Sequence, residues 1–320
     1  MRRAQEDERG RAATHPLQMP TVAWRDILWR AFKQMNANRL LAIAGGVAFF
    51  VLLALFPAIT AFISVYGLLF NPANVANSLS LLDDVVPRNV LGVVHEQALR
   101  IATNSNGALR IGVGAGIAVS LWSAMSGVRS VIDALNVIYG ERESRSFLRL
   151  NLIALAFTLS GFAVFLLAIA VVVVLPLALS RFGLASETAL LMKVVRWPAL
   201  LVVLLAGFAI PYRYGPDRRN ARWQWVSVGS AFGAVTFIAA SSLFSWFLGN
   251  FANYNATYGS LGAAVGLMMW LWMSTIVVLI GAQINAEIEH QTARDSTVGA
   301  DKPLGMRGAV MADTVGAKQG

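Results

Sequence analysis

Long uncharged runs alternate with short charged connectors along most of this chain. A helix needs about 20 mainly apolar residues to cross the hydrocarbon core of a bilayer. The longest run, from Trp223 to Ala286, holds 64 residues without a Lys, Arg, Asp or Glu, enough for two crossings joined by a turn. The pattern predicts an all-α, polytopic membrane protein. Its six predicted transmembrane helices lie at about 40–70, 111–140, 150–180, 192–212, 223–248 and 261–287.

The stretch Asn250 to Gly262 joins the last two predicted crossings. It is polar but uncharged, and its glycines permit tight turns while its amides and hydroxyls can donate and accept hydrogen bonds. These features predict either an ordered connection at the membrane interface or a plain external turn, and the pattern leaves both open. In the first case its polar side chains are candidate substrate contacts, namely Asn250, Tyr254, Thr257, Tyr258 and Ser260.

The segments outside the long runs are expected to differ in order. Residues 1–20 carry charge without apolar periodicity and are expected to form a disordered basic arm. Residues 71–107 are expected to form an external loop against the membrane, and residues 289–320 a disordered cytoplasmic tail. The remainder, residues 40–288, is the predicted transmembrane domain.

Residues 21–39 show helical periodicity and are predicted to form an amphipathic helix in the membrane interface. The alternative is a helix that docks on protein, and the pattern does not decide between them. Arg25, Arg30 and Lys33 lie off the apolar face. That face comprises Trp24, Ile27, Leu28, Ala31, Phe32 and Met35.

Lys and Arg are unevenly divided between the two sets of connectors. The N-terminal segment, the second and fourth connectors and the tail hold eight, three, four and four of these residues, 19 in all, against five on the other side. Cytoplasmic connectors of membrane proteins carry the excess of positive charge. We therefore expect both termini in the cytoplasm and the Asn250–Gly262 stretch on the external face.

Charged and amide side chains near the inner end of the second crossing form a second candidate site. Arg129 and Asp133 are four residues apart and share a helix face, and Asn136 lies close to that face. A charge at membrane depth usually faces protein or water. The three residues are therefore candidate substrate contacts towards the inside; the alternative is an ion pair whose arginine reaches out to the interface.

Further polar residues crowd the end of the sixth predicted crossing, where they could line an inner vestibule or mark a helix that enters water. They are Gln283, Asn285, Glu287 and Glu289. Small residues four apart allow close helix packing in lipid. Such pairs occur at Gly112/Gly116, Gly229/Gly233 and Gly262/Gly266.

The amino-acid composition excludes several kinds of site and partner but does not indicate a particular reaction. Hydrophobic residues make up 57% of the 320 residues and charged residues 13%, and there is no cysteine, which rules out disulfides and thiolate metal sites. The net charge of +9 follows the connectors, so no nucleic-acid partner is expected. His15, His95 and His290 fall in separate predicted segments, and no nucleotide-binding or hydrolase motif occurs. We expect no enzyme activity, no cofactor and no metal; the sequence indicates no oligomeric state.

Several short motifs, in this order, resemble the YihY/BrkB family of bacterial membrane proteins, historically labelled ribonuclease BN-like. The resemblance runs from about Trp24 to Glu289. One position departs from it, because the family often has Glu where this chain has Gln283. The motifs are Gly45-Gly-Val-Ala-Phe-Phe50 with Leu55-Phe-Pro57, Leu121-Trp-Ser-Ala124 with Gly127, Ala134-Leu-Asn136 with Tyr139, Tyr212-Arg213 with Pro216, Asn250-Phe251 with Tyr254, Thr257-Tyr-Gly-Ser-Leu-Gly262, and Gly281-Ala-Gln-Ile-Asn285.

The resemblance implies a six-helix protein of the bacterial inner membrane, in a family connected with envelope lipid movement and serum resistance. The expected function is a transporter or flippase of a lipid or other amphipathic envelope component, with membrane lipids as partners. No ATP-binding motif is present, so uphill transport would need an ion gradient or a separate ATPase. Two alternatives are a non-catalytic membrane scaffold and, less favoured, the ribonuclease of the family's older label.

Overall fold

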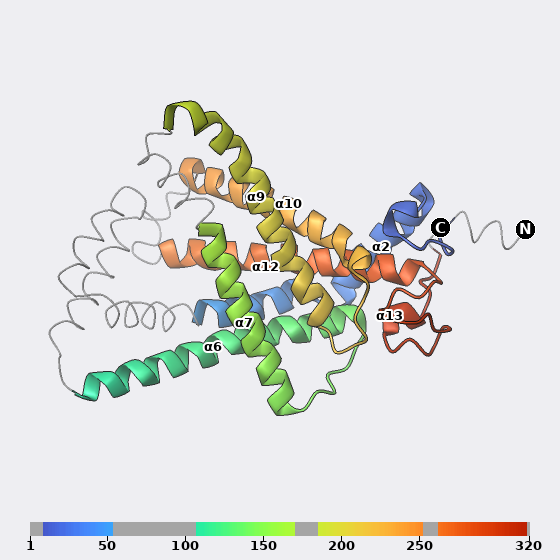
Figure 1. Cartoon of the computed structure of the whole chain (residues 1–320), viewed down its shortest axis with the longest axis horizontal. Helices are drawn as coiled ribbons and strands as arrows, with labels where there is room; N and C mark the ends of the chain where they lie inside the picture. The colour runs from blue at the N-terminus through green and yellow to red at the C-terminus, as the bar shows by residue number, and fades with distance from the viewer. Residues whose placement is uncertain (1–8, 54–106, 170–184, 252–261, 319–320) are drawn as a thin grey trace, which may run out of the picture. The chain divides into compact units, whose positions relative to one another are not determined.

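The computed structural model describes residues 9–53, 107–169, 185–251 and 262–318 (Figure 1). Within these ranges the secondary structure is helical, and β pairing is limited to an isolated bridge between Ala221 and Thr297. This confirms the predicted all-α class. Residues 71–106 of the predicted external loop lie outside the described ranges, as do the four outer candidate contacts that follow Asn250.

The described helices follow the apolar runs of the sequence. Four of them are long and apolar enough to span a membrane, through windows at Phe147–Val164, Trp197–Tyr214, Trp223–Asn250 and Ala264–Gln291. A fifth candidate joins α2 to the helix Leu40–Leu53 across a bend of 63°. The protein is therefore a multi-pass membrane protein, while the count of six and the side of the termini stay predictions. The elements are η1 (Pro16–Gln18), α2 (Thr21–Ala37), α6 (Gly107–Tyr139), α7 (Phe147–Ile169), α9 (Ala185–Tyr214), α10 (Trp223–Phe251), α12 (Gly262–Gln291) and α13 (Val310–Asp313).

The chain divides into two compact units. Unit 1 comprises residues 1–48 and 128–320, and unit 2 comprises residues 49–127. In unit 1, α12 is the central helix, because α2, α10 and α13 all pack against it, and α9 packs on α10 (Figure 1). In unit 2, Gly127 of α6 packs against Val51.

Helices α10 and α12 approach most closely at two glycines. A Cβ added to Gly229 would overlap the carbonyl oxygen of Gly281. The side chain of Asn285 bridges the same crossing, since its Oδ1 accepts a hydrogen bond from the Gly229 N–H at 2.7 Å and its Nδ2 donates to the Val226 carbonyl at 3.1 Å. Small residues permit this backbone approach in lipid, as predicted for Gly229.

The other predicted glycine pairs differ in their surroundings. Gly233 faces the ring of Phe208 on α9, so it too serves helix packing. By contrast, Gly266 has nothing within 4 Å of the place where a Cβ would lie. The side chains around Gly112 and Gly116 lie outside the described residues.

The two ends of the chain differ from the expectation of disorder. Residues 9–18 and 292–318 are described, and they hydrogen-bond to each other and to the end of α12. Arg11 donates to the carbonyl oxygens of Gln291 at 2.8 Å and Gly316 at 2.5 Å, and the Gly316 N–H donates to the His290 carbonyl at 2.8 Å. Arginines that cap main-chain carbonyls can order a segment that has no apolar periodicity.

Candidate functional site

The last two turns of α12 are polar in sequence yet buried in the structure. Gln283, Asn285, Glu287 and Glu289 are each no more than 1% exposed. Neither sequence-based expectation for this end, an inner vestibule or a helix entering water, describes it. We call this end of α12, with the N-terminal arm and tail packed on it, the polar cap.

On one side of the polar cap, Arg30 of α2 supplies the counter-charge. Its Nε lies 2.7 Å from Glu287 Oε2, and its Nη2 donates to Gln291 Oε1 at 2.7 Å. Its Nη1 reaches the Ala317 carbonyl at 3.1 Å. One buried guanidinium therefore joins α2, α12 and the C-terminal tail.

On the other side, Arg218 pairs with Glu289 at 2.7 Å and lies 4.1 Å above the ring of Tyr139. The second oxygen of Glu289 accepts a hydrogen bond from Ser296 at 2.6 Å. Buried carboxylates are tolerated when they are paired and hydrogen-bonded. Both acidic residues of α12, Glu287 and Glu289, are thus paired with arginines inside the protein.

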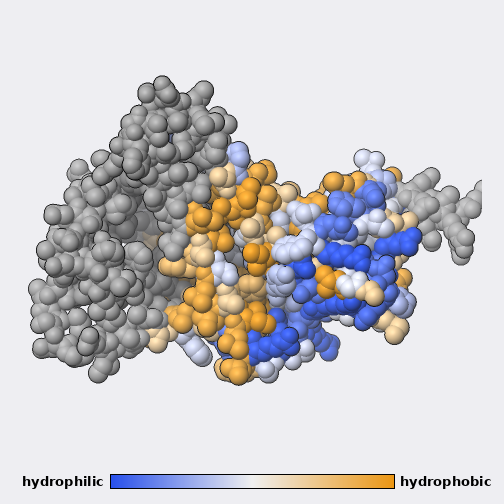
Figure 2. Space-filling view, in the orientation of Figure 1, coloured by the Kyte–Doolittle hydropathy of each residue, from blue (hydrophilic) through white to orange (hydrophobic). Residues whose placement is uncertain are grey.

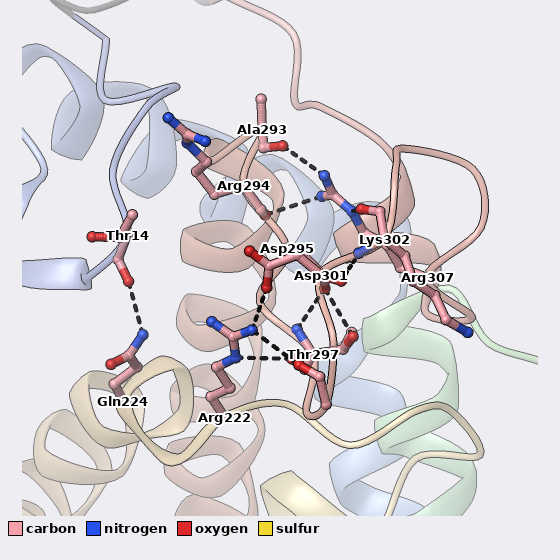
Figure 3. A network of polar contacts seen from close by, with 11 residues as sticks. Thr14, Arg222, Gln224, Ala293, Arg294, Asp295, Thr297, Asp301, Lys302 and Arg307 are labelled. Carbon is pink, nitrogen blue, oxygen red and sulfur yellow. Dashed lines mark hydrogen bonds and ion pairs between the residues drawn. The ribbon is translucent and has the colours of Figure 1, made fainter.

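The tail completes the polar cap through a network of main-chain contacts, shown in Figure 3. Arg307 donates to the carbonyl oxygens of Ala293, Arg294 and Lys302 at 2.7–3.1 Å. Arg222, just before α10, donates to the Thr297 carbonyl and pairs with Asp301. These contacts fold the tail back over the beginning of α10.

Of the inner candidate residues, Asn136 lies next to the polar cap, through Asp217, the neighbour of Arg218. Asn136 is buried, donates to Glu143 Oε2 at 2.9 Å and accepts from the Asp217 N–H at 2.8 Å. Arg129 donates to Asn151 of α7 at 3.1 Å, whereas Asp133 is exposed. Asn136 thus joins the loop after α6 to the loop after α9. Its role in substrate contact stays a prediction, as do those of Arg129 and Asp133.

Glu143 is stabilised as a carboxylate where the loop after α6 meets the loop after α9. Hydrogen bonds from Arg145 are the largest cause that lowers the pKa of Glu143, and the hydrogen bond from Asn136 adds to it. Arg145 also donates to the carbonyl of Gly215 at 2.9 Å. The two loops are therefore tied by both charge and main-chain contacts.

Among the outer candidates, Asn250 alone falls in the described ranges. It is exposed near the end of α10, and its Nδ2 donates to the carbonyl of Trp246 one turn earlier. Tyr254, Thr257, Tyr258 and Ser260 lie outside the described residues, so their predicted roles are not tested.

A shallow groove, open to the outside of the protein, lies between α10 and α12 on the halves of these helices that lead into and out of residues 252–261. Its volume is about 250 Å³. Trp270 Nε1 donates to Ser241 Oγ at 3.2 Å across it, and Gly266 leaves its wall without a side chain. The lining residues are Ser241, Phe244, Ser245, Leu248, Gly266, Leu267 and Trp270.

Figure 2 shows how polarity is distributed on this face of the molecule. Apolar side chains cover the middle of the helices, and polar side chains gather at the end that carries α13. Sequence reasoning did not find the groove. A signal was available, because Ser241 and Ser245 are four residues apart in an uncharged run and so share a helix face. Within the described ranges, no group of three or more His, Cys, Asp or Glu side chains could hold a metal ion.

Comparison with known proteins identifies the family. The family model described as virulence factor BrkB matches residues 31–304, which is most of the chain. The chain belongs to the BrkB family. The ordered motifs in the sequence predicted this membership.

Relatives in other bacteria extend over most of the chain. The ribonuclease-like protein YfkH of Bacillus subtilis is 31% identical, over 75% of this chain and 86% of its own length. The UPF0761 membrane protein PSHAa0171 of Pseudoalteromonas translucida is 25% identical over 79% of this chain and 82% of its own. A UPF0761 membrane protein of Haemophilus influenzae, NTHI0384, is 21% identical over 82% and 94%. No solved structure matches the chain.

Proposed function

We propose that this BrkB-family membrane protein binds a lipid or other amphipathic envelope component in the groove between α10 and α12 and moves it across the bacterial inner membrane. The observation that supports the proposal is the groove itself. Its wall is mostly apolar, yet it carries two serine hydroxyls, one of which accepts a hydrogen bond from the Trp270 N–H. Binding sites for amphipathic molecules combine apolar walls with a few placed polar groups.

The position of the groove connects it with the outer candidate residues. It lies on the helix halves that flank residues 252–261 in the sequence. Contacts of Tyr254, Thr257 and Tyr258 with the same substrate stay a prediction. Because no ATP-binding motif is present, net uphill movement would draw on an ion gradient or a separate ATPase.

The test is lipid movement in vesicles that contain the purified protein. Fluorescent phospholipid in the inner leaflet is counted by dithionite quenching, with and without a proton gradient. Ser245→Leu fills the groove and is expected to slow movement about tenfold, as loss of a few contacts in a binding site does. Ser242→Leu is the matched control, because Ser242 is exposed on the same helix and does not line the groove. Equal rates for the two variants, or no movement of any lipid by the unaltered protein, would count against the proposal.

A membrane scaffold is the second candidate function. The polar cap favours it, since the acids of α12 are engaged by Arg30 and Arg218 and both chain ends are fastened over them. In the same vesicles a scaffold moves no lipid, and affinity capture after cross-linking in cells would instead recover envelope proteins. A ribonuclease, the activity named for the Bacillus relative, predicts RNA cleavage that a point mutation abolishes; no described site supports it.

A further inference from the structure

The faces of α2 are arranged in an unusual way. The side that packs on α12 carries two charged residues, Asp26 and Arg30, which are 0% and 6% exposed. The side turned away from α12 is rich in large apolar side chains. A helix lying in water is expected to show the reverse arrangement, with its charges outside.

The buried charges of α2 are fully used by partners inside the protein. Asp26 pairs with Arg9 of the N-terminal arm at 2.7 Å, and Arg30 pairs with Glu287. Ile27 and Ala31, on the same side, are buried in the protein core. The side of α2 that packs on α12 therefore has its charged residues paired within the protein, and none of these pairs involves the outward side.

The outward side combines apolar and basic residues. Leu28, Trp29 and Phe32 are 53%, 57% and 60% exposed, and the rings of Trp29 and Phe32 lie 6.5 Å apart. We define the outward face of α2 as Val22, Arg25, Leu28, Trp29, Phe32 and Lys33, all of which are exposed. The sequence-based prediction of an apolar face that included Ile27 and Ala31 is corrected, because these two residues face the protein.

The position of α2 along α12 sets the depth of this face. Arg30 lies at the level of Glu287 in the polar cap, while Leu41, just after the 63° bend, accepts a hydrogen bond from Trp272 Nε1 at 3.1 Å. From residue 272 to residue 287, α12 rises about 22 Å at 1.5 Å per residue. The chain thus runs from the polar cap at α2 into the apolar half of α12, so α2 lies at the polar end of this helix.

We propose that the outward face of α2 docks on the surface of a phospholipid leaflet that contains anionic lipid. Tryptophan and phenylalanine insert at the boundary between headgroups and acyl chains. Lysine and arginine beside them complement the negative surface of such a leaflet. The six residues of this face include basic and apolar side chains and no acid, so an anionic lipid surface is the occupant that the face fits. The proposal does not depend on transport.

The absence of cysteine makes the test direct, because a spin label attaches only where a cysteine is introduced. Phe32→Cys and Leu28→Cys place the label on the outward face. Gln34→Cys is the matched control, since it is exposed and about 200° around the helix from Phe32. In nanodiscs with anionic lipid, the ratio of oxygen to nickel-chelate accessibility at Phe32→Cys is expected to exceed that at Gln34→Cys by about threefold.

A second set of measurements, in which charge is varied, tests the contact with lipid headgroups. Replacing anionic with neutral lipid, or introducing Lys33→Glu, is expected to lower the ratio at Phe32→Cys. Equal ratios at positions 32 and 34 would overturn the proposal, and a ratio indifferent to lipid charge would overturn its electrostatic part. Protection from both reagents, with short label-to-label distances between molecules, would assign the face to a second copy of the chain instead.

Discussion

At the scale of single residues, the glycines of α10 show how lipid-embedded helices come into contact. A Cβ added to Gly229 would overlap the backbone of α12, whereas one added to Gly249 would meet nothing within 4 Å, although both glycines occupy the same helix. Gly229→Ala is expected to lower the free energy of unfolding by about 1–3 kcal/mol, because the added methyl group forces α10 and α12 apart. Thermal unfolding in one detergent would measure this as a lower melting temperature.

Gly249→Ala is the control for that substitution. Alanine favours a helix over glycine by up to about 1 kcal/mol, so this variant is expected to be as stable as the unaltered protein or slightly more stable. If the two variants lost stability equally, the close approach of Gly229 to Gly281 would not be the cause.

At the scale of elements, α2 is fastened to α12 by a buried ion pair rather than by apolar contact alone. Arg30→Met leaves Glu287 buried without its guanidinium, and breaking such a pair costs about 3–5 kcal/mol. We expect a large fall in the denaturant midpoint. Lys33→Met, an exposed lysine one turn further along α2, is expected to leave it nearly unchanged.

A double substitution separates the pair from its burial. Arg30→Met combined with Glu287→Met removes both charges, and apolar side chains of similar volume often replace a buried ion pair with little loss. The double variant is therefore expected to be more stable than Arg30→Met alone. A double variant as unstable as the sum of its parts would show that the pair is not the link between α2 and α12.

At the scale of the whole molecule, the sequence predicted the helices far better than the contacts between them. The last two crossings, expected at 223–248 and 261–287, are observed as α10 and α12 within a few residues, because the need to bury backbone in lipid acts on every window of the chain. Arg30 and Glu287 are 257 positions apart, and no local pattern pairs them. The groove was not predicted from the sequence for the same reason, since it depends on which faces of α10 and α12 meet.

The two chain ends show a second limit of prediction from sequence patterns. Neither the arm nor the tail has apolar periodicity, which is what distinguishes an ordered segment in sequence. Their order comes instead from arginines that bind carbonyl oxygens, such as Arg11 and Arg307. An arginine with this role looks in sequence like any surface cation.

The tail therefore offers a prediction for the molecule as a whole. Arg307→Ala removes a buried side chain that donates to several carbonyls, and residues 292–318 are expected to exchange their amide hydrogens at least about tenfold faster, since each lost hydrogen bond to a charged group costs about 1.5–3 kcal/mol. Lys302→Ala is the control, because Lys302 is exposed and its main-chain N–H, not its side chain, bonds to Asp295. Faster exchange limited to residues 292–318 would show that the tail opens independently of the helices. Faster exchange that spread into α12 would show that the polar cap holds the helix ends together, whereas unchanged exchange in Arg307→Ala would contradict the role assigned to this arginine.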